Sequence, residues 1–389
     1  MDLSSVMIYA LQRNKFYYNI MTSNPKAIKE FPIITKDDVK NGFGNIVNYD
    51  LLSSSYIIAK TSGSSGLPLD IYWNEFDYLN SLKEIWKCRM NCGVTPHDRF
   101  VSAHILFEVN NLIYKNKIII NKNNMSISKV FMNDESLMSY YESIMEFDPK
   151  WMLLPPSFLY GFLLFLEKNN LRFSKHVKLI ELTGEACSRE VYDYFIKCYP
   201  SINWKILYGM QEFNAIAYGD INGLNVLTDN TYVEIIDNGK EMVNNSLEGD
   251  IVVTGLKNKA MPLVRYKSGD RGFFDSNHKL HITKSRSNDS FIYGNKKYDG
   301  SLFWSIITEL NVNTSNVVRQ FQVVLDTNGF TFNLVLNDVF FNETEIYSFI
   351  KHKLNDNYLI DIQISINIVE SINPIENSEK IKYFYNRII

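Results

Sequence analysis

The spacing of apolar residues changes character along the chain. Up to about residue 210, short β-type runs alternate with segments in which apolar residues recur every three or four positions. That is the pattern of strands alternating with helices, and it predicts parallel βαβ units. Strands are expected at residues 56–60, 69–73, 99–102, 117–120, 151–154, 179–182 and 205–207, and helices at residues 6–20, 76–90, 137–146, 158–167 and 188–198.

Beyond about residue 220 the runs become short and β-branched, with Asn-Gly and Gly turns between them, which indicates an antiparallel region. After residues 284–288 a second pattern follows, in the order helix, strand, strand, helix, strand, typical of a small α+β domain. We therefore predict an α/β fold with a large N-terminal domain, residues 1–284, and a small C-terminal α+β domain, residues 285–389.

Composition and charge exclude several classes of protein. With 46% hydrophobic and 21% charged residues, the chain is not largely disordered. Its net charge of -3 argues against a nucleic-acid partner, because proteins that track phosphate backbones carry a basic excess. The longest apolar stretch, near residues 158–166, is too short to cross a bilayer, so no membrane partner is expected. With only four cysteines and no signal-peptide pattern, we expect a cytoplasmic protein. Nothing in the sequence indicates the oligomeric state.

The strongest local signal is the segment TSGSSGLP at residues 61–68, between two predicted strands. Its glycines let the backbone turn tightly and present N–H groups, and its hydroxyls add donors without bulk, which suits a loop that grips phosphate oxygens. Alone, the segment fits a flexible hairpin turn equally well. The candidate phosphate-binding residues are Thr61, Ser62, Gly63, Ser64, Ser65 and Gly66.

Two later segments also carry candidate chemistry. In YGMQE, Glu212 follows a predicted strand, where a carboxylate can hold Mg²⁺ beside phosphates. In PLVRYKSGD, Asp270 can accept the hydroxyls of a ribose. Each segment has an ordinary alternative: Glu212 as a single exposed loop residue, Gly269-Asp270 as a plain turn, and Arg265 as a surface charge.

Taken in order, these segments resemble the adenylate-forming enzymes, specifically the phenylacetate–coenzyme A ligase-like branch and its capsule-biosynthesis relatives. The resemblance covers nearly the whole chain. The matching segments are FPIITKDDV, TSGSSGLPL, GVTPHDRF, LTGEACS, YGMQE, PLVRYKSGD, SRSND and SEKIKYF. It implies an adenylate-forming fold whose small C-terminal domain is a mobile lid.

The resemblance also implies an activity and a set of site residues. ATP with Mg²⁺ would activate a small carboxylic acid to an acyl-adenylate, and the acyl group would pass to a thiol (coenzyme A or a carrier protein) or to an amine. An aromatic or medium-sized apolar acid is expected. Glu212 would hold the metal and Lys380 would be catalytic. Nucleotide binding would involve the loop residues 61–66 together with Gly184, Glu185, Tyr208, Gly209, Asp270 and Arg286.

Some positions depart from the family pattern. The hinge segment begins with Ser285 instead of glycine and has Asn288 in place of an acid, and Glu379 precedes the final lysine where glycine is usual. These departures keep open a non-catalytic member that only binds nucleotide.

Other groups of reactive side chains mostly favour ordinary packing. Cys88 and Cys92, with His97 and His104 downstream, could form a zinc site, but buried free thiols are the simpler interpretation. Cys187 beside Glu185 is interpreted as a small filler rather than a nucleophile. His104 fits either an acyl pocket or a hydrogen-bonded core position.

Overall fold

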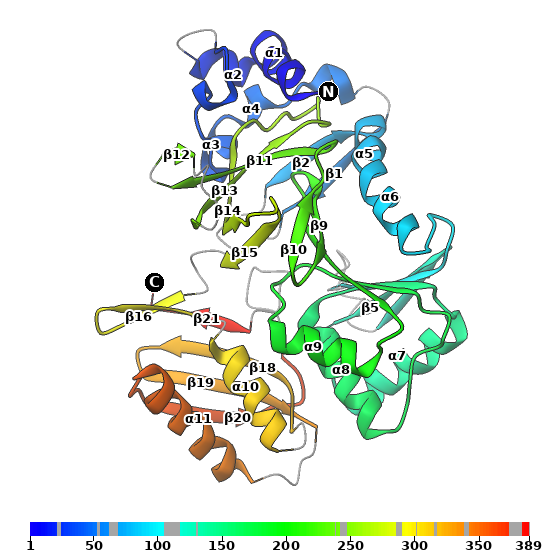
Figure 1. Cartoon of the computed structure of the whole chain (residues 1–389), viewed down its shortest axis with the longest axis vertical. Helices are drawn as coiled ribbons and strands as arrows, with labels where there is room; N and C mark the ends of the chain where they lie inside the picture. Colours follow the sequence, from blue (N-terminus) through cyan, green and yellow to red (C-terminus); the bar gives the residue numbers. More distant parts are fainter. Residues whose placement is uncertain are drawn as a thin grey trace. The chain divides into compact units, whose positions relative to one another are not determined.

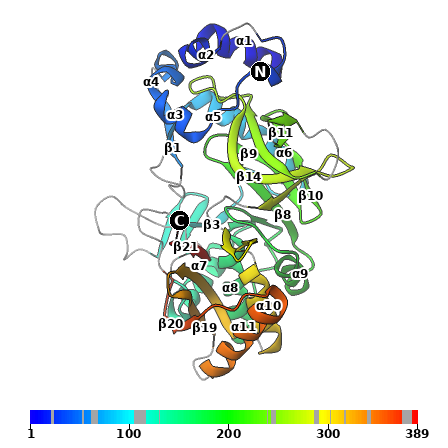
Figure 2. The ribbon, with the colours of Figure 1, turned by 90° about the vertical axis from the view of Figure 1, so that its left-hand side faces the viewer.

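The computed structural model describes residues 1–389 except 22–24, 53–54, 62–68, 105–116, 130, 238, 242–246, 285–289, 301, 315–316, 338–341, 373–382 and 389. The chain divides into two compact units (Figures 1 and 2). The first joins Met1–Thr95 to Lys205–Arg286, and the second joins Pro96–Trp204 to Ser287–Ile389. Each unit therefore combines two segments that are distant in the sequence.

The first unit opens with short helices and a β-hairpin. The helices are α1 (Leu3–Arg13), α2 (Lys15–Ile20), α3 (Lys36–Asn41) and α4 (Phe43–Ile46), with 3-10 turns at Ile28–Glu30 and Tyr49–Leu52. Thr35 caps α3 in a capping box with Asp38. Strands β1 (Tyr56–Lys60) and β2 (Asp70–Asn74) pair antiparallel, and α5 (Glu75–Ser81) and α6 (Lys83–Asn91) follow. The predicted phosphate loop is the segment that joins these two strands in the sequence.

The rest of the first unit is an antiparallel sheet, which confirms the expectation from the β-branched runs. Its strands are β8 (Asn203–Met210), β9 (Asn214–Asp220), β10 (Gly223–Val226), β11 (Thr231–Asp237), β12 (Lys240–Glu241), β13 (Gly249–Gly255), β14 (Tyr266–Phe274) and β15 (Leu280–Lys284). Their order is β12-β11-β13-β14-β15-β10-β9-β8. Ile251 and Val253 of β13 are fully buried in a core shared with the N-terminal helices and the β1–β2 hairpin. This packing fixes β8 and β14, which carry the candidate site.

The second unit contains parallel βαβ units, as predicted, but the predicted strands at residues 56–60, 69–73 and 117–120 pair antiparallel and lie outside that pattern. Strands β3 (Phe100–His104), β5 (Asn124–Ser128), β6 (Trp151–Leu154) and β7 (Leu179–Leu182) are parallel in the order β7-β6-β3-β5, and β4 (Ile118–Asn121) adds antiparallel to β5. Helices α7 (Asp134–Phe147), α8 (Pro156–Lys168) and α9 (Arg189–Cys198) follow β5, β6 and β7. Helix α8 is buried from Phe158 to Leu166. No helix in the described part of the chain is long and apolar enough to span a membrane.

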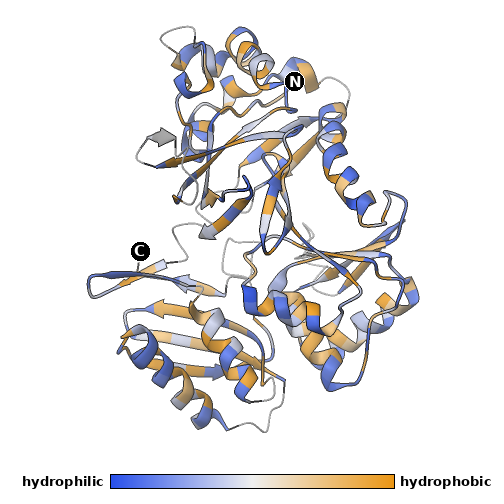
Figure 3. Ribbon diagram, viewed as in Figure 1, coloured by the Kyte–Doolittle hydropathy of each residue, from blue (hydrophilic) through white to orange (hydrophobic). Residues whose placement is uncertain are grey.

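The C-terminal part of this unit is a small α+β arrangement. A hairpin of β16 (Ser290–Tyr293) and β17 (Lys296–Asp299) precedes α10 (Leu302–Asn313), β18 (Val318–Asp326), β19 (Gly329–Leu336), α11 (Glu343–Tyr358), β20 (Ile364–Ile368) and β21 (Phe384–Asn386). The four-stranded sheet has the order β20-β19-β18-β21. Strands β18 and β19 are mainly hydrophobic, whereas α11 alternates hydrophilic and hydrophobic residues (Figure 3). The predicted order of elements is confirmed.

This C-terminal part packs closely on α8 of the same unit. A Cβ on Gly161 would lie 2.7 Å from the backbone oxygen of Arg319, so α8 and β18 approach each other directly. The buried Arg319 guanidinium bonds the carbonyl of Met132 at 2.8 Å and pairs with Asp134 at 2.5 Å. The boundary between residues 284 and 285 stays a prediction, because the structure groups Ser287–Ile389 with Pro96–Trp204.

Candidate active site

The base of the predicted phosphate loop is closed by Thr61. Its backbone N–H donates to the Leu69 carbonyl at 3.0 Å, and its Oγ1 accepts from the Leu69 N–H at 2.9 Å. Thr61 is buried, so the two ends of the loop are held against the core. Ser62, Gly63, Ser64, Ser65 and Gly66 lie outside the described residues.

The segment YGMQE forms the end of β8 and the turn into β9. Gly209 has a structural reason to be glycine, since a Cβ there would lie 2.4 Å from the carbonyl oxygen of Asn214. The pairing of β8 with β9 is irregular between Tyr208 and Gly209, and such a bulge changes where neighbouring side chains point. Glu212 lies in the turn and is 4% exposed. The alternative of a single exposed Glu212 is therefore wrong.

The segment YKSGD belongs to β14 and bulges out of it. The register against β13 jumps from Val252–Lys267 to Asp250–Arg271, which leaves residues 268–270 opposite a single residue. Gly269 has φ +87°, a conformation that glycine adopts without strain. The Ser268 hydroxyl accepts the Asp270 N–H at 3.1 Å and holds the bulge. Gly269-Asp270 is thus a strand bulge and not a plain turn.

The two segments meet through their tyrosines. The Tyr208 hydroxyl donates to Asp270 Oδ2 at 2.8 Å, and the Tyr266 hydroxyl donates to Glu212 Oε1 at 3.0 Å. All four residues belong to the first unit, although the partners are 62 and 54 positions apart in sequence. The structure therefore brings the predicted metal-binding and ribose-binding carboxylates to the same two strands, each oriented by a phenol from the other segment.

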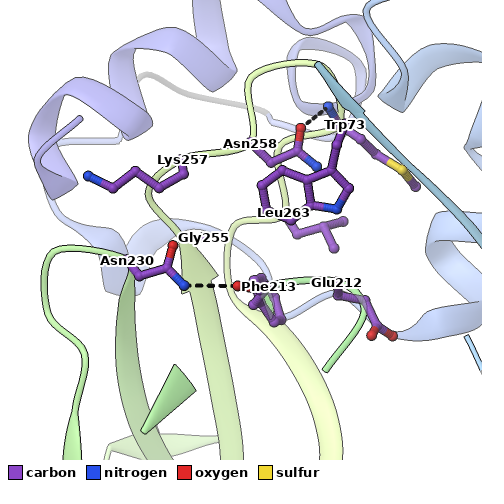
Figure 4. A pocket seen from close by; sticks show the side chains of 9 residues that line it. Trp73, Glu212, Phe213, Asn230, Gly255, Lys257, Asn258 and Leu263 are labelled. Atoms are coloured by element: carbon purple, nitrogen blue, oxygen red, sulfur yellow. Dashed lines mark hydrogen bonds between the residues drawn. The ribbon is translucent and has the colours of Figure 1, made fainter. Parts of the chain in front are cut away.

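Behind Glu212 lies a set of packed side chains that support the turn (Figure 4). The Asn230 amide donates to the Phe213 carbonyl at 2.9 Å, and the Trp73 indole N–H donates to the Gln211 carbonyl at 3.4 Å. In Figure 4 the Glu212 carboxylate points away from Trp73 and Phe213. Hydrogen bonds from Asn230 and Trp73 thus hold the backbone of the turn, and the Glu212 carboxylate lies on the side of the turn away from Trp73 and Phe213.

The donor set at Glu212 fits Mg²⁺. This ion prefers oxygen ligands and is usually held by one or two carboxylates together with water and substrate phosphates, not by a cage of protein side chains. Glu212 supplies one carboxylate, and Tyr266 orients it. Among the described residues there is no group of three or more His, Cys, Asp or Glu side chains that could hold a metal by themselves. Phosphate oxygens and water would have to complete the shell.

Arg265 is a buried structural residue, so its interpretation as a surface charge is wrong. It is 6% exposed, and its Nε donates to Glu234 Oε2 at 3.1 Å while Nη2 lies 3.1 Å from Oε1. Its Nη1 also bonds the carbonyls of Lys29 and Phe31 at 3.0 and 2.8 Å. Arg265 therefore ties the N-terminal segment to β11 at the start of β14.

We expect Arg265→Met to lower the free energy of unfolding by about 3–5 kcal/mol, because it leaves the buried Glu234 carboxylate without its positively charged partner. The double variant Arg265→Met/Glu234→Leu should recover much of that loss, since no buried charge is left unpaired. Urea unfolding midpoints of the three proteins provide the comparison. A double variant as unstable as the single one would show that the stranded charge is not the cause.

In the second unit, Gly184 and Glu185 follow β7. Gly184 has φ +86° and is exposed, and Glu185 Oε1 accepts the N–H of Ser157 at the start of α8 at 2.5 Å. Burial lowers the pKa of the nearby Lys129 ammonium, and the Glu185 carboxylate partly opposes that shift. Sequence reasoning missed Lys129, because a single lysine after a strand has no distinguishing pattern. Both Gly184 and Glu185 lie at the carboxyl end of a parallel strand, where ligands of α/β sheets bind.

The remaining candidate side chains support ordinary packing. Cys88 and Cys92 are half-buried free thiols, and His97 is exposed. The pKa of the Cys187 thiol is raised, first by burial and then by Glu185, which disfavours a nucleophilic thiolate. Arg286 and Lys380 lie outside the described residues, and so does the side chain of His104.

The similarity of this chain to known proteins is structural. No protein-family model matches the chain. No curated protein matches it in sequence. A solved 2-hydroxyisobutyryl-CoA ligase in the postadenylation state, in complex with R3-HIB-AMP, matches with a TM-score of 0.72 and 14% identity over 99% of this chain and 88% of that one.

Two further solved structures share the fold. An anthranilate CoA ligase in complex with anthranoyl-AMP matches with a TM-score of 0.58 and 14% identity, over 83% of this chain and 65% of that one. An amide bond synthetase from Marinactinospora thermotolerans matches with a TM-score of 0.51 and 14% identity, over 82% and 67%. The chain therefore has the mixed α/β fold of adenylate-forming ligases, with a small C-terminal domain built on the sheet β20-β19-β18-β21.

Proposed function

We propose that this protein is an AMP-forming ligase that activates a small carboxylic acid with ATP. The acid and ATP would give an acyl-adenylate and pyrophosphate, and the acyl group would then pass to a thiol of coenzyme A or of a carrier protein. The phenylacetate–coenzyme A ligase-like branch, a cytoplasmic location and an aromatic or medium-sized apolar acid remain parts of this proposal.

One observation carries the proposal. Two carboxylates that sequence reasoning assigns to metal and ribose, Glu212 and Asp270, are each oriented by a tyrosine hydroxyl of the opposite motif. Each bond joins two segments that the sequence assigns to the same site. This arrangement of two tyrosines and two carboxylates lies in a fold that is shared with ligases solved in complex with acyl-AMP compounds.

Each residue has a role that follows from its charge and position. Asp270 keeps Oδ1 for ribose hydroxyls while Oδ2 accepts from Tyr208. The ring of Tyr208, with Gly209 next to it, would flank the adenine, together with Gly184 and Glu185. The hydroxyls and N–H groups of residues 61–66 would hold the β- and γ-phosphates, and Arg286 would lie near the ribose or a phosphate.

In the reaction, a carboxylate oxygen of the acid attacks the α-phosphorus, and the bond from that phosphorus to the pyrophosphate oxygen breaks. Catalysis is then mainly positioning and stabilisation of developing charge. Glu212 would hold Mg²⁺, which when bound neutralises charge on the phosphate oxygens. Lys380 would stabilise the charge that develops at the α-phosphorus and the acid.

An amide-forming ligase is the second candidate, and the similarity to an amide bond synthetase supports it. It would use the same acyl-adenylate and differ only in its acceptor, an amine. A non-catalytic nucleotide-binding protein is a third candidate, suggested by Ser285, Asn288 and Glu379.

The test is ATP–pyrophosphate exchange over a panel of aromatic, fatty and amino acids. Acid-dependent exchange supports the ligase, and its absence with every acid, in a protein that still binds ATP, supports the non-catalytic alternative. The accepted acid is then incubated with coenzyme A, a carrier protein or an amine. The product identifies the acceptor.

We expect Asp270→Ala to raise the KM for ATP by roughly 10- to 100-fold, the range for hydrogen bonds to a charged group, with a smaller effect on kcat. Ribose contacts are present in both the ground state and the transition state, so losing them weakens binding more than chemistry. Steady-state exchange kinetics measure both constants.

Tyr208→Phe is the matched control, because it removes only the hydroxyl that orients Asp270. Its KM for ATP should rise less than that of Asp270→Ala. If Asp270→Ala leaves KM unchanged and kcat collapses, Asp270 acts on the reacting phosphate and not on the ribose.

A further inference from the structure

The amino ends of three neighbouring strands in the second unit carry a row of basic residues. Arg99, Lys150 and Lys178 each directly precede a strand, namely β3, β6 and β7. The Lys150 N–H donates to the Arg99 carbonyl at 2.8 Å, and the Lys178 N–H donates to the Lys150 carbonyl at 2.8 Å. The three residues are therefore neighbours across the strands, about 4.8 Å apart from one strand to the next.

The row lines a hollow of about 270 Å³. The other lining residues are Asp98, Asp148 and His176, so every side chain around it is ionisable. The hollow is large enough for a small anion.

Each cation in the row is held in place. Lys150 pairs with Asp98 at 3.1 Å. The Arg99 guanidinium lies over the Phe147 ring, 5.7 Å from its centre. The Lys178 ammonium donates to the Lys175 carbonyl at 3.2 Å. The side chains are thus positioned without collapsing onto one another.

The charge of the hollow is unbalanced. Three basic side chains and His176 line it against two carboxylates, and one of these, Asp148, lies 2.6 Å from the His176 ring nitrogen. Hydrogen bonding from the His176 ring lowers the pKa of the Asp148 carboxyl, so that group is ionised. Like charges placed directly across neighbouring strands destabilise a sheet. The Lys150–Asp98 pair offsets part of this repulsion, and a bound anion would offset more of it.

The position separates this hollow from the candidate active site. Gly184 and Glu185 follow the carboxyl end of β7, whereas Lys178 precedes its amino end. Strand β7 is Leu179–Leu182, and at about 3.3 Å per residue its two ends lie about 10 Å apart. The hollow therefore lies at the amino ends of the parallel strands, whereas Gly184 and Glu185 follow a carboxyl end.

We propose that this hollow is a second anion site, which binds a small molecule through a phosphoryl group. The Arg99 guanidinium can donate to two phosphate oxygens at once, and the Lys150 and Lys178 ammonium groups add positive charge next to it. The formal charge of the lining, +1 with His176 neutral, matches one phosphoryl group better than a polyanion. The site is independent of the proposed ligase activity.

The test uses the histidine next to the row as a reporter. The chain has six histidines, so protein labelled with ¹⁵N-histidine gives a simple imidazole spectrum, in which His176→Asn identifies the His176 signal. Inorganic pyrophosphate is titrated at constant pH and ionic strength, with EDTA present to remove metal ions. We expect the His176 signal to shift and saturate.

Two charge-matched double variants complete the experiment. Arg99→Gln/Lys178→Gln should weaken the apparent affinity by about tenfold or more, as expected when two charged contacts are lost. Lys197→Gln/Lys297→Gln removes two exposed cations outside the lining and should bind like the wild type. Circular dichroism checks that both variants fold.

The proposal is wrong if the His176 signal of the wild type does not respond to pyrophosphate. It is also wrong if that signal responds equally in Arg99→Gln/Lys178→Gln. Because pyrophosphate at the candidate active site would contact none of these residues, failure here leaves the proposed ligase activity unaffected.

Discussion

Replacing Glu212 by alanine is expected to abolish pyrophosphate exchange while the protein stays folded. Glu212 is the single carboxylate in the β8–β9 turn, and losing the proposed metal ligand should cost several kcal/mol of transition-state stabilisation. The measurement is acid-dependent exchange, with the thermal unfolding midpoint as the check on folding. Near-normal exchange by a folded variant would remove Glu212 from the mechanism.

Tyr266→Phe is the control for this variant. It keeps the carboxylate but removes the hydroxyl that donates to Glu212 Oε1 at 3.0 Å. Exchange should fall by much less than in Glu212→Ala, because the ligand remains and only its orientation is loosened. An equal loss in both variants would mean that the Tyr266–Glu212 bond is needed for folding of the turn and would not identify a metal ligand.

Replacing Lys380 by alanine is expected to lower adenylation by roughly 10²–10³, the typical loss for one preorganised electrostatic contact. In a closed, shielded site an ammonium interacts with the reacting phosphate much more strongly than in water. The charge it stabilises is greatest in the transition state. Acyl transfer from a chemically prepared acyl-adenylate should be largely spared, because that half-reaction would use a second orientation of the C-terminal domain.

Lys382→Ala is the internal control, and its effect should be small. If Lys382 matters and Lys380 does not, the register assigned to SEKIKYF is wrong. If neither matters and exchange continues, the C-terminal domain does not supply the catalytic charge.

The proposed change of orientation, about Asn288, would have to break the Arg319–Asp134 contact and the close packing at Gly161. Asp134→Asn therefore tests whether that contact limits acyl transfer.

Elements with an uninterrupted local pattern were predictable. Residues 56–60, 151–154 and 179–182 are observed as strands with the expected bounds, because each is a short apolar run between breaks in the pattern. Helix α8 extends past its predicted residues 158–167 by only a few positions. Local pattern is enough for residues 151–154, 179–182 and helix α8 because they are buried almost throughout, and enough for residues 56–60 although that strand is partly exposed.

Elements that depend on distant partners were predicted poorly. Residues 76–90 form two helices that meet at Leu82, and next to the break the Ser81 hydroxyl accepts from Asn214. Strand β5 was missed, since its sequence NMSIS is half polar and its pairing with β3 and β4 decides its state. Strand β14 was expected only at residues 272–274, because the bulge at residues 268–270 interrupts its alternation.

The sequence by itself determined the class of fold, the order of the main elements in the C-terminal part and the residue types that could bind phosphate, metal and ribose. Only the tertiary structure decided that Arg265 is buried, that Tyr208 holds Asp270 and that Tyr266 holds Glu212. The physical reason is the range of the interactions. Periodicity and turn chemistry act over a few residues, whereas these contacts join positions 54 and 62 residues apart, through the register of one bulged strand.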